Sequence, residues 1–258
     1  MVIRLLLNVM ILPSPKDAVH KAWLYRLLIE LYDDPLVANN LYFKGGTCAA
    51  MLGWLDRFSV DLDFDYVGTR KELPAVRRNM EKIFSDMGIE IKDKSKKIPQ
   101  YFLKYPVSEG TRNTIKIDTT FPPVKANVYR PVRFSEIDRI IPCQTIETMF
   151  ANKLVAPVDR WEKKERLAGR DLYDVHHFFL RGFSYNEAVI KERRKTAVRT
   201  YFKKLIGFIE KKITERIIDQ DLNLLLPPEK FRQARKIVKR EAIMFLKDEI
   251  ARLEKKKR

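Results

Sequence analysis

The chain has 258 residues, 45% of them hydrophobic, which is enough for one large domain or two small domains with packed cores. The two cysteines, Cys48 and Cys143, have no metal-ligand spacing, which excludes a zinc site and argues against a disulfide framework, so we expect a cytoplasmic protein. The formal net charge of +17 predicts salt-dependent binding to polyanions such as RNA or DNA, although lysine-rich helices that only maintain solubility would give the same excess.

The spacing of apolar residues predicts alternating helices and strands as far as residue 121. The apolar segment 4–13 is too short to span a bilayer and lacks a signal-peptide cleavage site, so we expect a strand or a buried helical turn there. Further helices are predicted over residues 14–32, 48–55 and 74–87. Strands are predicted over residues 41–44, 59–67, 89–91, 101–105 and 114–121.

Two prolines, Pro122 and Pro123, end the strand pattern, and the chain after Gln144 is predicted to be almost wholly helical. The predicted helices there cover residues 145–157, 171–180, 185–212 and 229–256. We therefore expect an α+β fold, in which residues 1–141 form a small mixed β-sheet with flanking helices and residues 142–258 form an all-helical domain. Residues 184–258 carry 22 Lys and Arg against 11 Asp and Glu, which makes their helices the expected polyanion-binding surface.

The predicted strand 59–67 carries closely spaced carboxylates. Asp61 and Asp63 would project from one face because side chains alternate along a strand, and Asp65 would join them if the strand continues. Neighbouring carboxylates repel each other unless a cation neutralises them, and Mg²⁺ prefers carboxylate and phosphate oxygens. A solvated strand face is the alternative, but the apolar residues between the aspartates favour a buried opposite face.

A third carboxylate, Asp118, lies between apolar neighbours on the predicted strand 114–121. If this strand pairs beside strand 59–67, Asp118 completes the acidic cluster. The alternative is an ordinary polar residue at a strand end.

A small-residue turn, Gly45-Gly46-Thr47, precedes the acidic strand. Glycines let backbone N–H groups approach phosphate oxygens closely. The turn is not a Walker loop because no Gly-Lys-Ser/Thr follows at the required spacing, and a simple turn is the alternative.

The helical half contains a lysine and aspartates at helical spacing. Lys153 lies on the predicted helix 145–157, and Asp171 and Asp174 lie on one face of the next helix. One interpretation is a lysine that reaches nucleotide phosphates and an aspartate that acts on the attacking hydroxyl. The other is ordinary ion pairing between helices.

Taken together, these residues resemble the AbiEii toxin family of the polymerase-β-type nucleotidyltransferase superfamily. The resemblance covers roughly residues 40–180. The matching blocks, in family order, are Phe43-Lys44-Gly45-Gly46-Thr47, Arg57 to Phe64, the strand ending in Asp118, Lys153-Leu154-Val155-Ala156 and Arg170-Asp171-Leu172-Tyr173-Asp174. The segment between Lys153 and Arg170 is longer than expected, which leaves open whether Arg160 or Arg166 fills the family's arginine role.

The resemblance implies a nucleotidyltransferase core and transfer of a nucleoside monophosphate from an NTP, with pyrophosphate leaving. It implies that Asp61, Asp63 and Asp118 hold Mg²⁺, with two ions expected and Mn²⁺ as an alternative. The implied catalytic residues are Asp61, Asp63, Asp118, Lys153 and Asp171. The implied nucleotide-binding residues are Lys44, Gly45, Gly46, Thr47, Arg57, Ser59 and Lys153.

Family members are toxins of two-gene toxin–antitoxin or phage-defence systems, and some are similar to enzymes that add nucleotides to the 3′ end of tRNA. We therefore expect an RNA acceptor held by the basic C-terminal helices, a cognate antitoxin as a further partner, and no membrane association. Two alternatives remain: nucleotide transfer to a protein hydroxyl, and a non-catalytic protein of the same fold that binds NTP or nucleic acid.

Overall fold

The computed structural model describes residues 10–107 and 112–255. Most of the predicted N-terminal element, residues 4–9, lies outside the described residues. The remainder, Met10 to Pro13, forms neither helix nor strand, and the Met10 side chain is buried.

Two compact units make up the chain. Met1–Pro123 and Tyr129–Gln144 form the first, which we call the sheet unit, and Val124–Val128 with Thr145–Arg258 form the second, the helical unit. Pro142 lies within the last strand of the sheet unit. The division into separate folding domains at residues 141 and 142 stays a prediction.

A seven-stranded mixed sheet forms the centre of the sheet unit, in the order β3-β4-β5-β2-β1-β7-β6. The strands are β1 (Leu41–Lys44), β2 (Leu62–Tyr66), β3 (Glu90–Lys94), β4 (Tyr101–Lys104), β5 (Thr114–Thr120), β6 (Tyr129–Phe134) and β7 (Arg139–Gln144). β2 is antiparallel to β1 and parallel to β5, so it lies between the strand that enters the glycine turn and the strand that carries Asp118.

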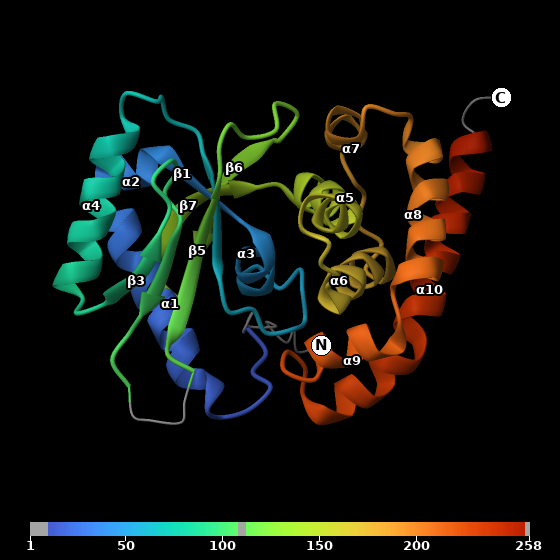
Figure 1. Ribbon diagram of the computed structural model, residues 1–258, viewed down its shortest axis with the longest axis horizontal. Coiled ribbons are helices and arrows are strands. Elements are labelled where there is room, and N and C mark those ends of the chain that lie inside the picture. The colour runs from blue at the N-terminus through green and yellow to red at the C-terminus, as the bar shows by residue number, and fades with distance from the viewer. Residues whose placement is uncertain (1–9, 108–111, 256–258) are drawn as a thin grey trace, which may run out of the picture. The chain divides into compact units, whose positions relative to one another are not determined.

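The helices of the sheet unit are α1 (Asp17–Asp33), α2 (Pro35–Asn40), α3 (Gly45–Met51) and α4 (Leu73–Asp86). Figure 1 shows α1, α2 and α4 together on one side of the sheet. Alternate residues of the central strands, such as Phe43 and Phe64, are fully buried, as are Leu27 of α1 and Phe84 of α4. The apolar alternation that predicted the strands therefore builds one hydrophobic core against these helices.

The prediction that Pro122 and Pro123 end the sheet was wrong. β6 and β7 form an antiparallel hairpin after them, in which Pro131 stands opposite Pro142. Proline lacks the N–H that a strand ladder uses, so a segment with proline reads poorly as a strand unless it lies at an edge, as β6 does.

The helical unit contains α5 (Ile146–Lys164), α6 (Gly169–Leu180), α7 (Glu187–Arg194), α8 (Val198–Lys212), α9 (Glu215–Leu222) and α10 (Pro228–Lys255). The single helix predicted over residues 185–212 is divided, because Lys195 has a φ of +51° and ends α7 in the left-handed conformation. α2 and α9 were not predicted. None of the helices in the described part of the chain has the length and apolar character needed to cross a bilayer.

Candidate active site

Two of the predicted acids lie side by side on the sheet. In the register of the strands, Lys44 of β1 pairs with Asp63 of β2, and Asp63 pairs with Asp118 of β5. Residues directly opposite each other on neighbouring strands share a face. The pairing required for Asp118 to join Asp63 is therefore present, and Lys44 lies in the same row.

Asp61 does not lie on the strand as predicted, because β2 begins one residue later, at Leu62. Two buried side chains instead hold the segment that precedes β2. The Thr47 hydroxyl donates a 2.5 Å hydrogen bond to the Asp61 main-chain carbonyl, and His20 Nε2 donates a 2.9 Å hydrogen bond to the Val60 carbonyl. Thr47 was predicted to bind nucleotide, yet its hydroxyl contacts the main chain that carries Asp61.

His20 is a residue of this site that sequence reasoning did not assign. Its ring is 1% exposed, and its Nδ1 lies 2.7 Å from the Tyr105 hydroxyl. Burial lowers the pKa of His20 to about 4. The imidazole is therefore neutral near pH 7, and a lone histidine on α1 has no sequence signal that would reveal its contact with Val60, 40 residues away.

The glycine turn lies against the predicted acidic and basic side chains. Gly45 has a φ of +83°, and a Cβ at this position would lie 2.1 Å from Asp63 Oδ2. A Cβ on Gly46 would lie 2.7 Å from Ser59 Oγ and 3.2 Å from Arg57 Nη2. Only glycine permits this backbone conformation and this close approach. The turn thus places Gly45 next to Asp63, and Gly46 next to Ser59 and Arg57.

Asp65 has a different environment from Asp63. Its carboxylate is fully buried and accepts hydrogen bonds from Lys44 Nζ at 2.6 Å, from Tyr129 at 2.7 Å and from Gln144 at 2.7 Å. Protein donors therefore neutralise Asp65. The Lys44 ammonium is held there beside the row of Asp63 and Asp118.

No three His, Cys, Asp or Glu side chains among the described residues are close enough together to form a metal cluster. Asp118 accepts a 2.6 Å hydrogen bond from Gln100 Nε2 and contacts Lys116 Nζ. The donor set nevertheless fits Mg²⁺, because proteins often hold this ion with one or two carboxylates while substrate phosphates supply further oxygens. Asp63 and Asp118 supply such carboxylates, and Asp61, on the segment before β2, supplies a third.

The predicted residues of the helical unit form two ion pairs between α5 and α6. Lys153 Nζ lies 2.7 Å from Asp174 Oδ2, and the Asp174 side chain is fully buried. Arg160 contacts both oxygens of Asp171, at 2.7 and 3.2 Å. Arg166 is exposed beyond the end of α5. Of the two candidate arginines, it is therefore Arg160 that pairs with Asp171. The ion pairing between helices that the sequence allowed is also present.

Comparison with known proteins gives consistent results. A family model described as "Nucleotidyl transferase AbiEii toxin, Type IV TA system" matches residues 26–248. The fold is similar to a candidate nucleotidyltransferase from H. pylori, with 19% identity, a TM-score of 0.56, and coverage of 91% of this chain and 98% of that chain.

Two further solved structures share the fold. JHP933 from Helicobacter pylori has 20% identity and a TM-score of 0.55, covering 95% of this chain and 99% of that chain. The nucleotidyltransferase toxin MenT4 from Mycobacterium tuberculosis has 19% identity and a TM-score of 0.55, covering 90% of this chain and 84% of that chain. A search of curated proteins gives no match.

Proposed function

Because the chain belongs to the AbiEii family of nucleotidyl transferase toxins, we propose that it moves a nucleoside monophosphate from an NTP to the 3′ end of an RNA, with tRNA as the leading candidate. The family makes the protein a nucleotidyltransferase. The acceptor, the metal and the roles of individual residues are the proposed parts.

One observation carries the proposal: the glycine turn and the row of acids meet at Asp63. Gly45 approaches the Asp63 carboxylate from β1, and Asp118 pairs with Asp63 from β5. Such an arrangement suits an NTP whose phosphates lie along Gly45 and Gly46, with Arg57 and Ser59 close to the second glycine. Nucleotidyl transfer depends mainly on positioning and charge stabilisation, which this set of residues supplies.

In this proposal Asp61, Asp63 and Asp118 would hold two Mg²⁺ ions, with Mn²⁺ as the alternative metal. The metal would supply charge stabilisation for the attacking hydroxyl and the leaving pyrophosphate. The chain's own contribution is orientation: Thr47 and His20 fix the segment that carries Asp61, and Gly45 leaves room for the Asp63 carboxylate. Lys44, held by Asp65, adds positive charge beside the row.

We further propose catalytic roles for Lys153 and Asp171 of the helical unit. We assign Lys153 to phosphate contact, with the buried Asp174 as the group that orients its ammonium. Asp171 is the proposed acid, and Arg160 orients its carboxylate through two hydrogen bonds. These assignments rest on the family resemblance and on the geometry within the helical unit.

An RNA acceptor is favoured by charge. The helical region after Ser184 is strongly basic, and basic helices bind the RNA backbone without sequence preference. α8 and α10 pack together and carry exposed lysines and arginines, which include Lys203, Arg232, Lys236 and Arg240.

We further propose that the protein acts in the cytoplasm as the toxin of a two-gene system with a cognate antitoxin.

The test is to incubate the purified protein with each α-labelled NTP, Mg²⁺, and either total tRNA or cell lysate. Label at the 3′ end of RNA is the expected result. Label in protein would instead establish transfer to a protein hydroxyl. If no acceptor is labelled and NTP binding persists in Asp61→Ala, the protein is a binding protein and the catalytic proposal fails.

A further inference from the structure

The sheet face that carries Asp63 and Asp118 continues onto β4, where it presents an aromatic ring. Phe102 of β4 stands directly opposite Lys116 of β5, two residues before Asp118. The Phe102 side chain is 46% exposed, and every other phenylalanine among the described residues is more buried. Lys116 Nζ lies 5.8 Å from the centre of the Phe102 ring and also contacts the Asp118 carboxylate. Lys116 thus links an exposed ring to the proposed metal site.

The strand hairpin beside Phe102 is rich in lysine. Residues 92–104 contain five lysines and one aspartate, a local net charge of +4. Lys96 and Lys97, in the turn between β3 and β4, are both exposed. We call the segment 94–97 the lysine turn. Its residues belong to the sheet unit, whereas the basic helices after Ser184 belong to the helical unit.

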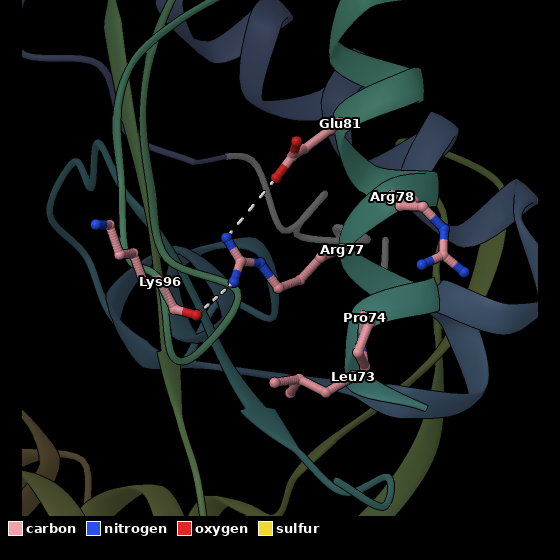
Figure 2. Close-up of a pocket in the computed structure, with 6 residues that line it drawn as sticks. All are labelled: Leu73, Pro74, Arg77, Arg78, Glu81 and Lys96. Atoms are coloured by element: carbon pink, nitrogen blue, oxygen red, sulfur yellow. Dashed lines mark hydrogen bonds and ion pairs between the residues drawn. The ribbon is translucent and has the colours of Figure 1, made fainter. Parts of the chain in front are cut away.

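The main chain of the lysine turn is firmly held. Arg77 of α4 donates hydrogen bonds to the Lys96 carbonyl at 2.8 Å and to the Ser95 carbonyl at 2.7 Å, and Figure 2 shows its guanidinium reaching from the helix to Lys96. Behind the turn, the Thr119 hydroxyl donates to the Pro99 carbonyl at 2.5 Å. These bonds fix the backbone. The Lys96 and Lys97 side chains are exposed to solvent, and Lys94 Nζ pairs with Glu81 at 2.7 Å.

A surface pocket of about 300 Å³ lies beside the lysine turn. Its lining residues are Leu73, Pro74, Arg77, Arg78, Glu81 and Lys96 (Figure 2). Three of these carry positive charge and one carries negative charge. The pocket therefore extends the positive surface from the lysine turn onto α4.

We propose that Phe102, Lys116 and the lysine turn hold the single-stranded 3′ end of the acceptor RNA. An exposed aromatic ring that stacks on a base, flanked by cations that contact phosphates, is the usual means of binding single-stranded nucleic acid. The proposal rests on the nucleotide transfer proposed above and names the acceptor side of that site.

The order of the strands supports this assignment. In the order β3-β4-β5-β2-β1, Asp63 of β2 lies between the glycine turn after β1 and the ring on β4. The NTP and the acceptor would then approach the acidic row from opposite sides. If Asp118 also held Mg²⁺, its carboxylate would attract the Lys116 ammonium less strongly, and Lys116 could then contact an RNA phosphate.

The direct test is fluorescence anisotropy with a fluorescein-labelled 12-nucleotide single-stranded RNA and the full chain without NTP. Phe102→Ala is expected to weaken binding about ten-fold, because one stacked base is lost, whereas Phe102→Tyr retains an aromatic face and should bind as the wild type does. Leu180→Ala, which removes a 59% exposed side chain from the helical unit, is the control and should change nothing.

The lysine turn has its own test. Lys96→Gln with Lys97→Gln should reduce the slope of log Kd against log salt by about 1.4, since each phosphate contact on a single strand contributes about 0.7. Lys71→Gln with Lys82→Gln removes the same charge from exposed sites elsewhere in the sheet unit and should leave the slope unchanged. Oligonucleotide affinity that does not respond to Phe102→Ala or to the Lys96 and Lys97 changes would overturn the proposal.

Kinetics separates this proposal from the proposed function. If nucleotide transfer to RNA occurs, Phe102→Ala should raise the KM for RNA about ten-fold with little change in the KM for NTP. An equal rise in both constants would contradict an acceptor site. If the wild type transfers no nucleotide to RNA but its oligonucleotide affinity depends on Phe102, the transfer proposal fails and the RNA site stands.

Discussion

The two units assemble their candidate functional groups by different means. In the sheet unit, strand register and glycine contacts place Asp63 beside Asp118 and Gly45. In the helical unit, side-chain ion pairs between α5 and α6 bring Lys153 to Asp174 and Arg160 to Asp171. Backbone contacts leave almost no room for substitution, whereas an ion pair can be replaced as a pair. Four predictions test this difference.

The largest effect on stability is expected in the helical unit. Lys153→Met removes the ammonium beside the fully buried Asp174 carboxylate, and loss of one partner of a buried pair costs about 3–5 kcal/mol. The double variant Lys153→Met with Asp174→Leu should recover most of this loss. Urea unfolding of the wild type and both variants measures it, and equal stability of all three would contradict a structural role for the pair.

In the sheet unit, we expect the buried neutral His20 to make a pH-dependent contribution to the free energy of unfolding. The folded-state pKa of about 4 lies below the ordinary value of 6.5, so the unfolded chain binds the proton more readily. The contribution is complete above pH 6.5 and is lost as the pH falls toward 4. Its size is roughly 2.5 kcal/mol between pH 7 and pH 4.5. Urea unfolding at these two pH values should show a smaller acid loss for His20→Gln than for the wild type.

Replacing a glycine with alanine should have opposite effects in the two units: a loss of activity in the sheet unit and a gain of stability in the helical unit. Gly45→Ala places a Cβ against Asp63 at a positive φ, and displacement of a reacting group by about 1 Å costs about 100-fold in rate. Gly207→Ala in α8 meets no atom within 4 Å and should stabilise the helix by about 0.5–1 kcal/mol. Transfer assays and thermal unfolding measure both variants. A Gly45→Ala enzyme with full activity would show that this close contact is not required.

The smallest effect concerns Glu162, at the surface of the helical unit. Hydrogen bonds from Arg194, and then from Lys204, lower the pKa of Glu162 to about 2. The contribution of Glu162 to the free energy of unfolding is present above about pH 4.5 and is lost as the pH falls toward 2. Because the side chain is 43% exposed, solvent screening keeps it below about 1 kcal/mol. Glu162→Gln should therefore lower stability slightly at pH 7, and less in high salt.

Sequence patterns predicted the parts of the molecule that depend on local periodicity. The strands that carry Asp63 and Asp118 follow from apolar alternation, and their pairing, which the strand register shows, was stated only as the condition for Asp118 to complete the acidic cluster. The β6–β7 hairpin was missed because Pro131 and Pro142 oppose a strand interpretation. The end of α7 was missed because a lysine, Lys195, adopts the left-handed conformation usual for glycine.

The missed parts of the site depend on contacts between distant residues. His20 reaches Val60 across 40 positions, and Thr47 reaches the Asp61 carbonyl across 14. Neither contact leaves a periodic signal in the sequence. The start of β2 at Leu62 also shows that alternation alone does not locate the end of a strand, so Asp61 was assigned to the strand although it precedes it.

The most direct test of the central claim is the rate of label transfer from α-labelled NTP to RNA as Mg²⁺ is titrated. The comparison needs the wild type, Asp63→Asn, Asp118→Asn, and Asp86→Asn as an exposed control on α4. We predict that Asp86→Asn transfers label at the wild-type rate, whereas Asp63→Asn and Asp118→Asn lose transfer at every Mg²⁺ concentration while remaining folded. Wild-type transfer by either of these two variants would contradict the assignment of the acidic row as the catalytic centre.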